Sequence, residues 1–199
     1  MNYNLVMEKI IDGLDSRPRL LMHACCGVCS SSVIERLNDY FDITILYYNP
    51  NTYPYDEYIK RFDTLKELIS KMKIDIKVME IGWENESFNE ISFGLEDERE
   101  GGRRCSKCYK LRLEKTALIA KKNNFDYFCT TLSVSPYKNS SLLNKIGEEL
   151  EDEYGVKYLY SDFKKKDGYK RSNELSRKFD LYRQDYCGCK YSLMESRSH

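Results

Sequence analysis

The sequence lacks net charge, long apolar runs, internal repeats and low-complexity segments. Lys and Arg together number 32, as do Asp and Glu, so no global field directs the chain to nucleic acid or membrane. No apolar run approaches the roughly 20 residues of a transmembrane helix. Residues 1–19 intersperse charges with apolar residues and have no signal-peptide core. We therefore expect a cytoplasmic protein that does not contact membranes and whose thiols are kept reduced.

Strand-like and helix-like segments alternate along the chain. Strands are predicted at about residues 19–24, 43–48, 74–81, 126–131 and 156–160. Helices are predicted at about residues 3–15, 30–40, 58–72, 105–123 and 140–153. A serine at 30–32 is expected to cap the second helix, and Gly155 to end the last.

This order predicts a doubly wound α/β fold, in which a parallel sheet carries helices on both faces. We expect one domain over residues 1–199. The basic, cysteine-containing segment 162–199 is expected to fold back over the carboxyl edge of the sheet.

Three cysteines follow the first predicted strand. Cys25, Cys26 and Cys29 fall within five residues, at the carboxyl end of the strand, where open α/β sheets bind ligands. Packing explains one buried cysteine better than three in one turn. Eight cysteines in a reducing compartment favour metal binding or redox catalysis over structural disulfides. The turn is therefore predicted to bind a metal.

A second pair, Cys105 and Cys108, opens a predicted helix. The positive end of the helix dipole is expected to lower the pKa of these thiols and to suit an anionic cluster. Together with Cys25 and Cys26, the pair can supply four thiolates to one centre, either zinc or [4Fe–4S]. The adjacent Cys-Cys does not match the paired spacing of a zinc ribbon, which favours iron–sulfur.

The last two cysteines form the motif Cys187-Gly188-Cys189. A bridge between them would be strained and therefore easily reduced, as catalytic disulfides are. Alternatively, both thiols ligate a second metal together with Cys29 or a nearby carboxylate. Cys129, inside a strand, is predicted to be a buried, inert thiol, and His23 to be a hydrogen-bonded core residue.

A basic segment precedes this motif and contains Lys164, Lys165, Lys166, Lys170 and Arg171. Aromatic residues lie beside these cations, and the whole chain has 17 tyrosines, several of them next to cysteine motifs. Cations interleaved with aromatics suit a single-stranded nucleic-acid loop, because the rings stack on bases and the cations pair with phosphates. A solvated charged surface is the alternative.

Further motifs accompany the cysteines in a specific order: Tyr48-Asn49-Pro50-Asn51, Glu57-Tyr58 with Arg61, Thr130-Thr131-Leu132, Ser135-Pro136 with Lys138, Asp162-Phe163-Lys164-Lys165-Lys166-Asp167-Gly168 and Leu181-Tyr182-Arg183-Gln184. Over residues 20–192 the chain thereby resembles the QueH-type epoxyqueuosine reductases. The chain departs from the family pattern at three positions. Gly27-Val28 stands where the family usually has Ala-Pro, and Cys129 where threonine is usual, which supports a non-ligand role for Cys129.

The resemblance implies an adenine-nucleotide-hydrolase-like (HUP) fold and an oxidoreductase that converts epoxyqueuosine to queuosine in a tRNA anticodon loop, the last step of queuosine synthesis. It implies a [4Fe–4S] cluster on Cys25, Cys26, Cys105 and Cys108. It also implies a redox pair, Cys187 and Cys189. The family is associated with an additional mononuclear iron, for which Cys29 and Cys189 are the nearest spare thiols. The electron donor is not identified by the sequence.

Reduction of an epoxide requires two electrons, two protons and a Lewis acid, which an iron centre but no side chain here supplies alone. Tyr109, Tyr186 and Asp185 are proton-donor candidates by proximity in sequence. One alternative is an iron–sulfur tRNA thiolation enzyme of the same fold. It requires a Ser-Gly-Gly-x-Asp-Ser phosphate loop, where this chain has residues 25–30, Cys-Cys-Gly-Val-Cys-Ser. A zinc-stapled RNA-binding module is the other alternative, and it leaves Cys187 and Cys189 without a role.

Overall fold

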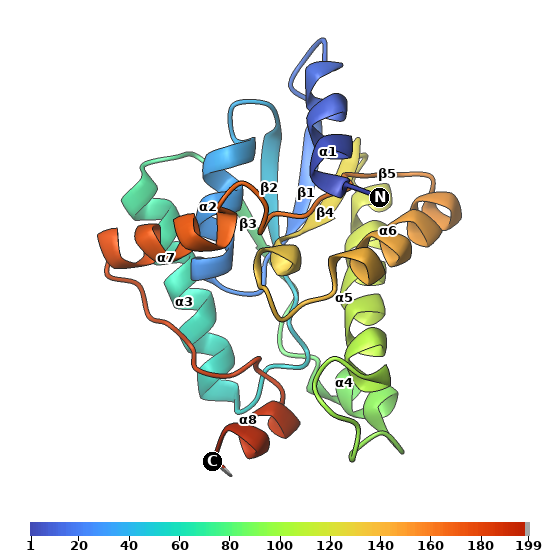
Figure 1. The fold of residues 1–199 in the computed structure, drawn as a ribbon, viewed down its shortest axis with the longest axis vertical. Helices are drawn as coiled ribbons and strands as arrows, with labels where there is room; N and C mark the ends of the chain where they lie inside the picture. Colours follow the sequence, from blue (N-terminus) through green and yellow to red (C-terminus); the bar gives the residue numbers. More distant parts are fainter. Residues whose placement is uncertain (198–199) are drawn as a thin grey trace.

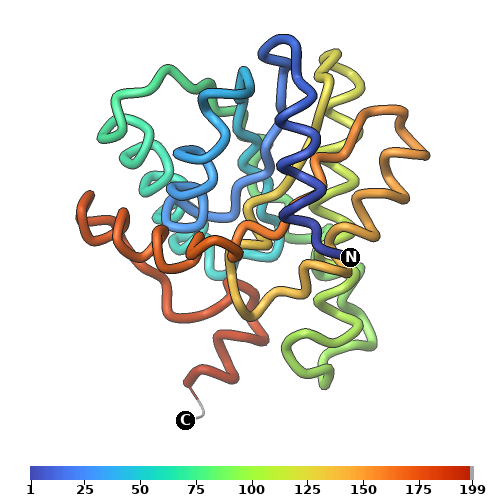
Figure 2. The backbone as a smooth tube through the Cα atoms, turned by 45° about the horizontal axis from the view of Figure 1, so that its top comes forward, coloured from blue at the N-terminus to red at the C-terminus, as the bar shows by residue number. Residues whose placement is uncertain are grey.

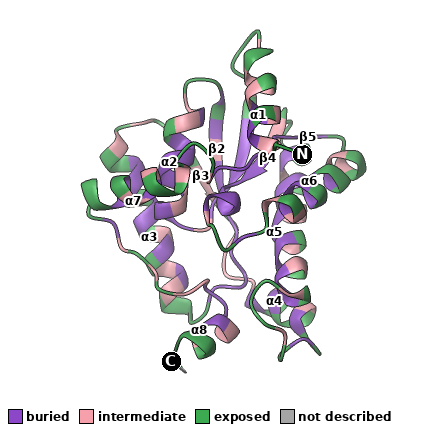
Figure 3. Ribbon diagram, in the orientation of Figure 1, coloured by how far each residue is buried: buried purple, intermediate pink, exposed green. Residues whose placement is uncertain are grey.

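A five-stranded parallel sheet lies at the centre of the computed structural model, which describes residues 1–197 (Figure 1). Residues 198–199, the end of the expected tail segment, lie outside the described residues. The strands are β1 (Arg19–His23), β2 (Asp42–Tyr47), β3 (Lys77–Glu80), β4 (Tyr127–Thr130) and β5 (Lys157–Tyr158). Leu20 to His23 are all buried, as expected for a parallel strand covered on both faces (Figure 3).

Helices cover both faces of the sheet (Figure 1). On one face, Leu20 and Met22 of β1 pack in a core with residues of α1 (Tyr3–Asp12), α2 (Gly27–Leu37) and α3 (Tyr55–Met72). On the other, Leu21 packs with residues of α5 (Arg103–Lys122) and α6 (Ser140–Tyr154). Successive residues of a strand point to opposite faces, so β1 alone contributes to both cores.

The strand order β3-β2-β1-β4-β5 is doubly wound, as predicted. The direction of winding reverses at β1, which has β2 on one side and β4 on the other. Ligands of such sheets bind beside the carboxyl ends of the strands at this reversal. The carboxyl ends of β1 and β4, with Cys25 and Thr131 directly after them, therefore border the expected site.

Several predicted boundaries were wrong. β3 and β5 are shorter than the predicted strands 74–81 and 156–160, and both are edge strands that pair on one side only. α2 begins at Gly27, so Cys29 lies inside the helix. The cap is Cys26, whose Sγ accepts from the Cys29 N–H at 3.4 Å. The Ser30 and Ser31 hydroxyls donate instead to the carbonyls of Cys26 and Val28.

Two helices were not predicted. α4 (Asn85–Ser92) lies in the charged stretch before α5, and α8 (Lys190–Arg197) follows the last cysteine. Between the sheet and α8, the tail segment also forms α7 (Gly168–Lys178). A 3₁₀ turn, η1 (Thr131–Val134), follows β4. The missed helices have eight residues each, and Phe88 is the one apolar residue that they bury, so they show little apolar periodicity.

The tail returns to the carboxyl edge of the sheet, as predicted, and α8 projects from that end of the molecule (Figures 1 and 2). The Tyr53 N–H, in the loop after β2, donates to the Gly188 carbonyl at 2.8 Å. Arg61 of α3 donates to the carbonyls of Cys187 (3.0 Å) and Tyr186 (3.2 Å). Among residues 1–197, no helix has the length and apolar character required to span a membrane.

Candidate metal centre and active site

Three thiols meet where the chain leaves β1. The Sγ atoms of Cys25, Cys26 and Cys29 all lie within 4.8 Å of one another. Cys25 is positioned by Thr131 at the end of β4, whose Oγ1 accepts from the Cys25 N–H at 3.4 Å. We refer to Cys25, Cys26 and Cys29 as the strand thiols.

The three strand thiols differ in how readily they ionise. Hydrogen bonds from Cys26 and Cys29 lower the pKa of Cys25 well below its ordinary value. The same contacts with Cys25 raise the pKa values of Cys26 and Cys29. One thiolate therefore forms readily, and its charge opposes ionisation of its neighbours. A bound cation removes this opposition, and three soft thiolates suit iron or zinc.

A second group, Cys105, Cys108, Cys187 and Cys189, joins the start of α5 to the tail; we refer to these residues as the helix–tail thiols. Cys108 and Cys189 pack together with Phe88 of α4 in a small buried cluster. Burial raises the pKa of Cys105 and raises that of Cys108 to about 12. The predicted lowering of these two pKa values was wrong, because the loss of hydration outweighs the helix dipole.

Arg112 places a positive charge between the two thiol groups. Its side chain is 3% exposed, and its Nη2 donates to Asn49 Oδ1 at 2.6 Å. The ion pairs of residues 1–197 give it no carboxylate partner. Burial opposes its charge, but Cys108, Cys25 and Cys187 raise its pKa overall. Its Nε donates to His23 Nε2 at 3.3 Å, so both the Asn49 and the His23 partners are neutral groups, and the nearby cysteines are the groups whose ionisation would compensate its charge.

Lys138 places a second cation against the tail. Its Nζ lies 2.9 Å from Cys187 Sγ and 2.9 Å from Glu100 Oε1, and the residue is 8% exposed. The Cys187 N–H donates to Ser192 Oγ at 3.1 Å, and Ser192 Oγ donates to Glu100 Oε2 at 3.3 Å. Cys187 is thus held by both its thiol and its backbone.

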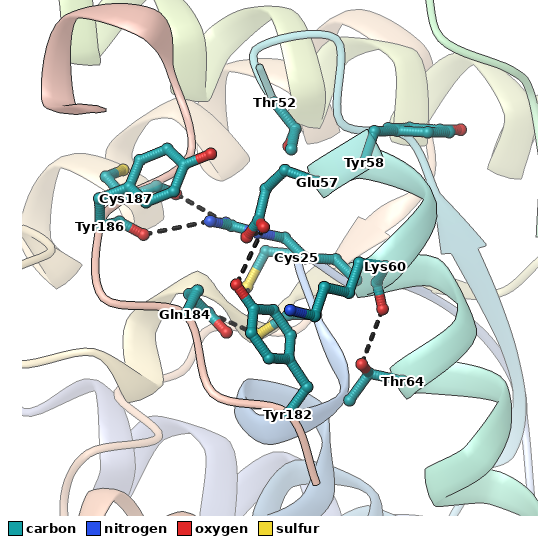
Figure 4. Close-up of polar contacts among 12 residues, drawn as sticks. Cys25, Thr52, Glu57, Tyr58, Lys60, Thr64, Tyr182, Gln184, Tyr186 and Cys187 are labelled. Atoms are coloured by element: carbon teal, nitrogen blue, oxygen red, sulfur yellow. Dashed lines mark hydrogen bonds and ion pairs between the residues drawn. The ribbon is translucent and has the colours of Figure 1, made fainter. Parts of the chain in front are cut away.

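Residues 182–187 form a strap across the strand thiols (Figure 4). The Gln184 Nε2 donates to Cys26 Sγ at 3.0 Å, and the Tyr182 hydroxyl donates to Glu57 at 2.9 Å. Glu57 also pairs with Arg61 at 2.7 Å, so one carboxylate of α3 joins both ends of the strap. The strap therefore shields Cys26 from solvent, and Cys26 is 1% exposed.

Comparisons to known proteins show the family of the chain. The family model for epoxyqueuosine reductase QueH matches residues 20–195. The chain is 38% identical over 204 residues to epoxyqueuosine reductase QueH of Staphylococcus epidermidis, covering 98% of this chain and 86% of the relative. It is 40% identical over 199 residues to that of Streptococcus pyogenes, covering 96% and 78% respectively. The chain belongs to the QueH family. It is an oxidoreductase of the epoxyqueuosine reductase type.

A solved structure supports the HUP-like fold of this QueH family member. The U34-tRNA thiolase NcsA from Methanococcus maripaludis, described with its [4Fe–4S] cluster, aligns with a TM-score of 0.51. The alignment covers 98% of this chain and 69% of NcsA at 14% sequence identity. At that identity the likeness concerns the fold and not the reaction.

The predicted cluster ligands of this family member come from both thiol groups. Cys25 and Cys26 lie with Cys29, whereas Cys105 and Cys108 lie with the tail cysteines. Their convergence on one cluster stays a prediction. All eight cysteines are free thiols, so the structure gives no support to a disulfide between Cys187 and Cys189.

The predictions for His23 and Cys129 are confirmed. His23 is fully buried; its Nδ1 lies 2.9 Å from Thr130 Oγ1 and its Nε2 lies 3.1 Å from the Tyr48 carbonyl. Burial lowers the pKa of His23 to about 3, so the ring is neutral. Cys129 is also fully buried, and burial alone raises its pKa.

Of the proton-donor candidates, Tyr109 lies against the thiols. Burial raises its pKa, and the charges of Lys138, Cys105 and Cys187 act on it. The Tyr186 hydroxyl donates instead to the Tyr53 carbonyl, and Asp185 is exposed. Tyr109 is therefore the candidate that the fold brings to the site.

Three of the five cations of the basic segment form ion pairs with carboxylates of the same chain. Lys164 contacts Asp162 at 2.6 Å, and Lys166 contacts Glu8. Arg171 contacts Glu35 at 2.7 Å and Glu174 at 3.1 Å. Lys165 and Lys170 are exposed. A role of this segment in nucleic-acid binding stays a prediction.

Sequence patterns alone gave no roles to Arg112, Lys138 and Gln184. Arg112 follows Cys108 by four residues on α5, so helical spacing places it on the same face and was a usable signal. Lys138 and Gln184 approach thiols that are 49 and 158 residues away in sequence. No local pattern predicts such contacts.

Proposed function

We propose that this chain reduces the epoxide of epoxyqueuosine in the anticodon loop of a tRNA to give queuosine, using a [4Fe–4S] cluster held by Cys25, Cys26, Cys105 and Cys108. The observation that carries the proposal is the convergence of the strand thiols, whose Sγ atoms all lie within 4.8 Å of one another. The same core contains Arg112, a buried cation with no carboxylate partner among residues 1–197. A buried charge needs a compensating charge nearby. A cluster with four thiolates supplies it.

The residues present fit such a cluster. The strand thiols already lie close enough to bind one metal centre, and Cys105 and Cys108 add the thiolates that an iron–sulfur cluster requires. Gln184 offers an N–H to Cys26 Sγ, the kind of hydrogen bond that tunes cluster potentials. NcsA, which has the same fold, is described with a [4Fe–4S] cluster.

The reaction converts the epoxide to an alkene and water with two electrons and two protons. A bound iron–sulfur cluster would supply electrons and Lewis acidity to this reaction. Lys138 and Tyr109 hold protons beside Cys187, and we assign the proton transfer to these two residues. The strap over Cys26 excludes water from this reaction.

We further propose that Cys187 and Cys189 act in turnover as a dithiol that passes electrons from a separate, unidentified donor. The alternative role for these thiols is ligation of an additional mononuclear iron together with Cys29. The Lys138 ammonium group, which donates to Cys187 Sγ at 2.9 Å, is compatible with both roles, and the tail variants below distinguish them. We place the enzyme in the cytoplasm, where its tRNA substrate occurs.

The proposal is tested by anaerobic purification with iron, sulfide and absorption measurements, followed by conversion of epoxyqueuosine-containing tRNA. We expect about four irons and four sulfides per chain, and queuosine as the product. Stoichiometric zinc without labile sulfide would refute the redox function and favour the zinc-stapled RNA-binding module. Thiolated tRNA formed from ATP and sulfide would favour the thiolation enzyme.

The tail is tested separately with Cys187→Ser and Cys189→Ser. Both variants should retain iron, sulfide and tRNA binding but fail to sustain multiple turnovers. A partial loss of iron with unchanged sulfide would favour the second-iron role. Full activity in either variant would remove the tail thiols from the reaction.

A further inference from the structure

Two exposed tyrosines flank the tail cysteines. Tyr137 is 78% exposed, and the next residue, Lys138, reaches Cys187 Sγ at 2.9 Å. Tyr53 is 42% exposed, and its N–H donates to the Gly188 carbonyl at 2.8 Å. The two rings therefore belong to two loops that contact the same tail turn. The loop after β2 carries Tyr53 and contacts Gly188, and the loop after η1 carries Tyr137 and contacts Cys187.

Both loops are held firmly. The Tyr137 N–H donates to Ser135 Oγ at 3.3 Å, and the Lys138 N–H donates to the Ser135 carbonyl at 3.2 Å. The Tyr53 carbonyl accepts from the Tyr186 hydroxyl. A ring presented by a fixed loop loses little conformational entropy when it binds a partner.

Positive charge lies at the same edge. The first turns of α5, next to Cys105 and Cys108, expose Arg103 and Lys107, of which Arg103 pairs with Glu98 at 2.6 Å. Exposed rings beside exposed cations form the usual surface for single-stranded RNA, because every base offers a face for stacking and every nucleotide a phosphate.

We propose that Tyr137 and Tyr53 stack on the unpaired bases that flank the modified nucleotide of an RNA loop. The inference rests on the proposed function. When the modified base of a nucleotide reaches the Cys187 thiol, the adjacent nucleotides of the RNA loop lie within reach of the Tyr137 and Tyr53 rings. This surface, and not the largely paired segment 164–171, makes the main contact with the loop.

The test measures binding of an anticodon stem-loop RNA to the metal-loaded protein by fluorescence anisotropy. Stacking on one base contributes about 1–3 kcal/mol, so Tyr137→Ala should weaken binding by about 5- to 150-fold. Tyr137→Phe keeps the ring and should bind as the wild type does. Tyr53→Ala should also weaken binding. A 2-aminopurine placed beside the target nucleotide should be quenched by the wild type but not by Tyr137→Ala.

Tyr40→Ala is the matched control. Tyr40 is 46% exposed but lies in the turn between α2 and β2, at the opposite end of the sheet (Figure 1). It should leave binding unchanged. Equal binding by Tyr137→Ala and the wild type, or a larger loss in Lys164/Lys165/Lys166→Ala than in Tyr137→Ala, would overturn the inference. Binding is read without turnover, so failure of the proposed reduction is scored independently.

Discussion

Replacement of Gly27 by alanine tests how tightly α2, whose first turn carries Cys29, packs on α3. A Cβ at Gly27 would lie 2.7 Å from the Thr64 carbonyl oxygen and 3.0 Å from its carbonyl carbon and Cγ2. The closest of these atoms belong to the backbone of α3, so no side-chain rotation relieves the contact. Carbon–oxygen contacts normally lie at about 3.3 Å or more, so the helices must separate by about half an ångström.

The expected change in the free energy of unfolding is the difference between two effects. Overpacking of a close contact destabilises by about 1–3 kcal/mol. Replacement of glycine by alanine within a helix stabilises the helix by up to about 1 kcal/mol. We therefore expect Gly27→Ala to lower the free energy of unfolding by about 1–2 kcal/mol, which for a chain of this length lowers Tm by about 2–8 °C.

The measurement is chemical denaturation followed by circular dichroism, with Gly13→Ala as control. A Cβ at Gly13 would lie 3.5 Å from the Lys9 carbonyl oxygen, an ordinary contact, so that variant should be unchanged or slightly more stable. Displacement of α2 should also move Cys29 and loosen bound iron. If Gly27→Ala is as stable as the wild type, α2 and α3 separate freely and the argument from close packing is refuted.

Four further substitutions test the metal centre and the proton transfer. Cys105→Ala should abolish the broad visible absorption of anaerobically prepared protein, whereas Cys129→Ala should retain it; the reverse result would contradict the ligand assignment. Arg112→Met should accelerate loss of iron to a chelator by about tenfold, equivalent to 1.4 kcal/mol, because it removes the cation that faces the thiolates; unchanged iron loss would show that the charge is compensated elsewhere. Lys138→Met should lower kcat by about 10²–10⁴, as loss of a general acid does, with iron content unchanged; wild-type kcat would exclude Lys138 from proton transfer.

Regular structure could be predicted from the sequence where the local signal is strong. The apolar residues of β1 and the helical spacing in α3 and α5 predicted these elements and placed Cys25 and Cys105 at element ends. The weaker signals failed for physical reasons. Strand β5 is short because it pairs with β4 alone, and α4 is an eight-residue helix with few buried residues.

The partners of charged groups could not be predicted in the same way. Lys166 and Arg171 look like part of a basic surface in the sequence, yet they pair with Glu8 of α1 and Glu35 of α2. Lys138 lies in a polar loop, where a lysine is normally exposed to solvent, but it is buried against Cys187. Such contacts depend on how distant segments meet, which no local pattern records.

Although the chain has no net charge, buried positive charge is concentrated near the thiol groups. Arg61, Arg112 and Lys138 are all buried near thiols; Arg61 and Lys138 have carboxylate partners in Glu57 and Glu100, whereas Arg112 faces thiols. A buried cation destabilises a fold unless negative charge accompanies it. Ionised thiols supply that charge most readily when metal holds them ionised, so the proposed cluster would couple metal binding to folding stability through Arg112. Loss of the metal should consequently weaken the packing of α5 against β1, and loss of Arg112 should weaken the hold on the metal.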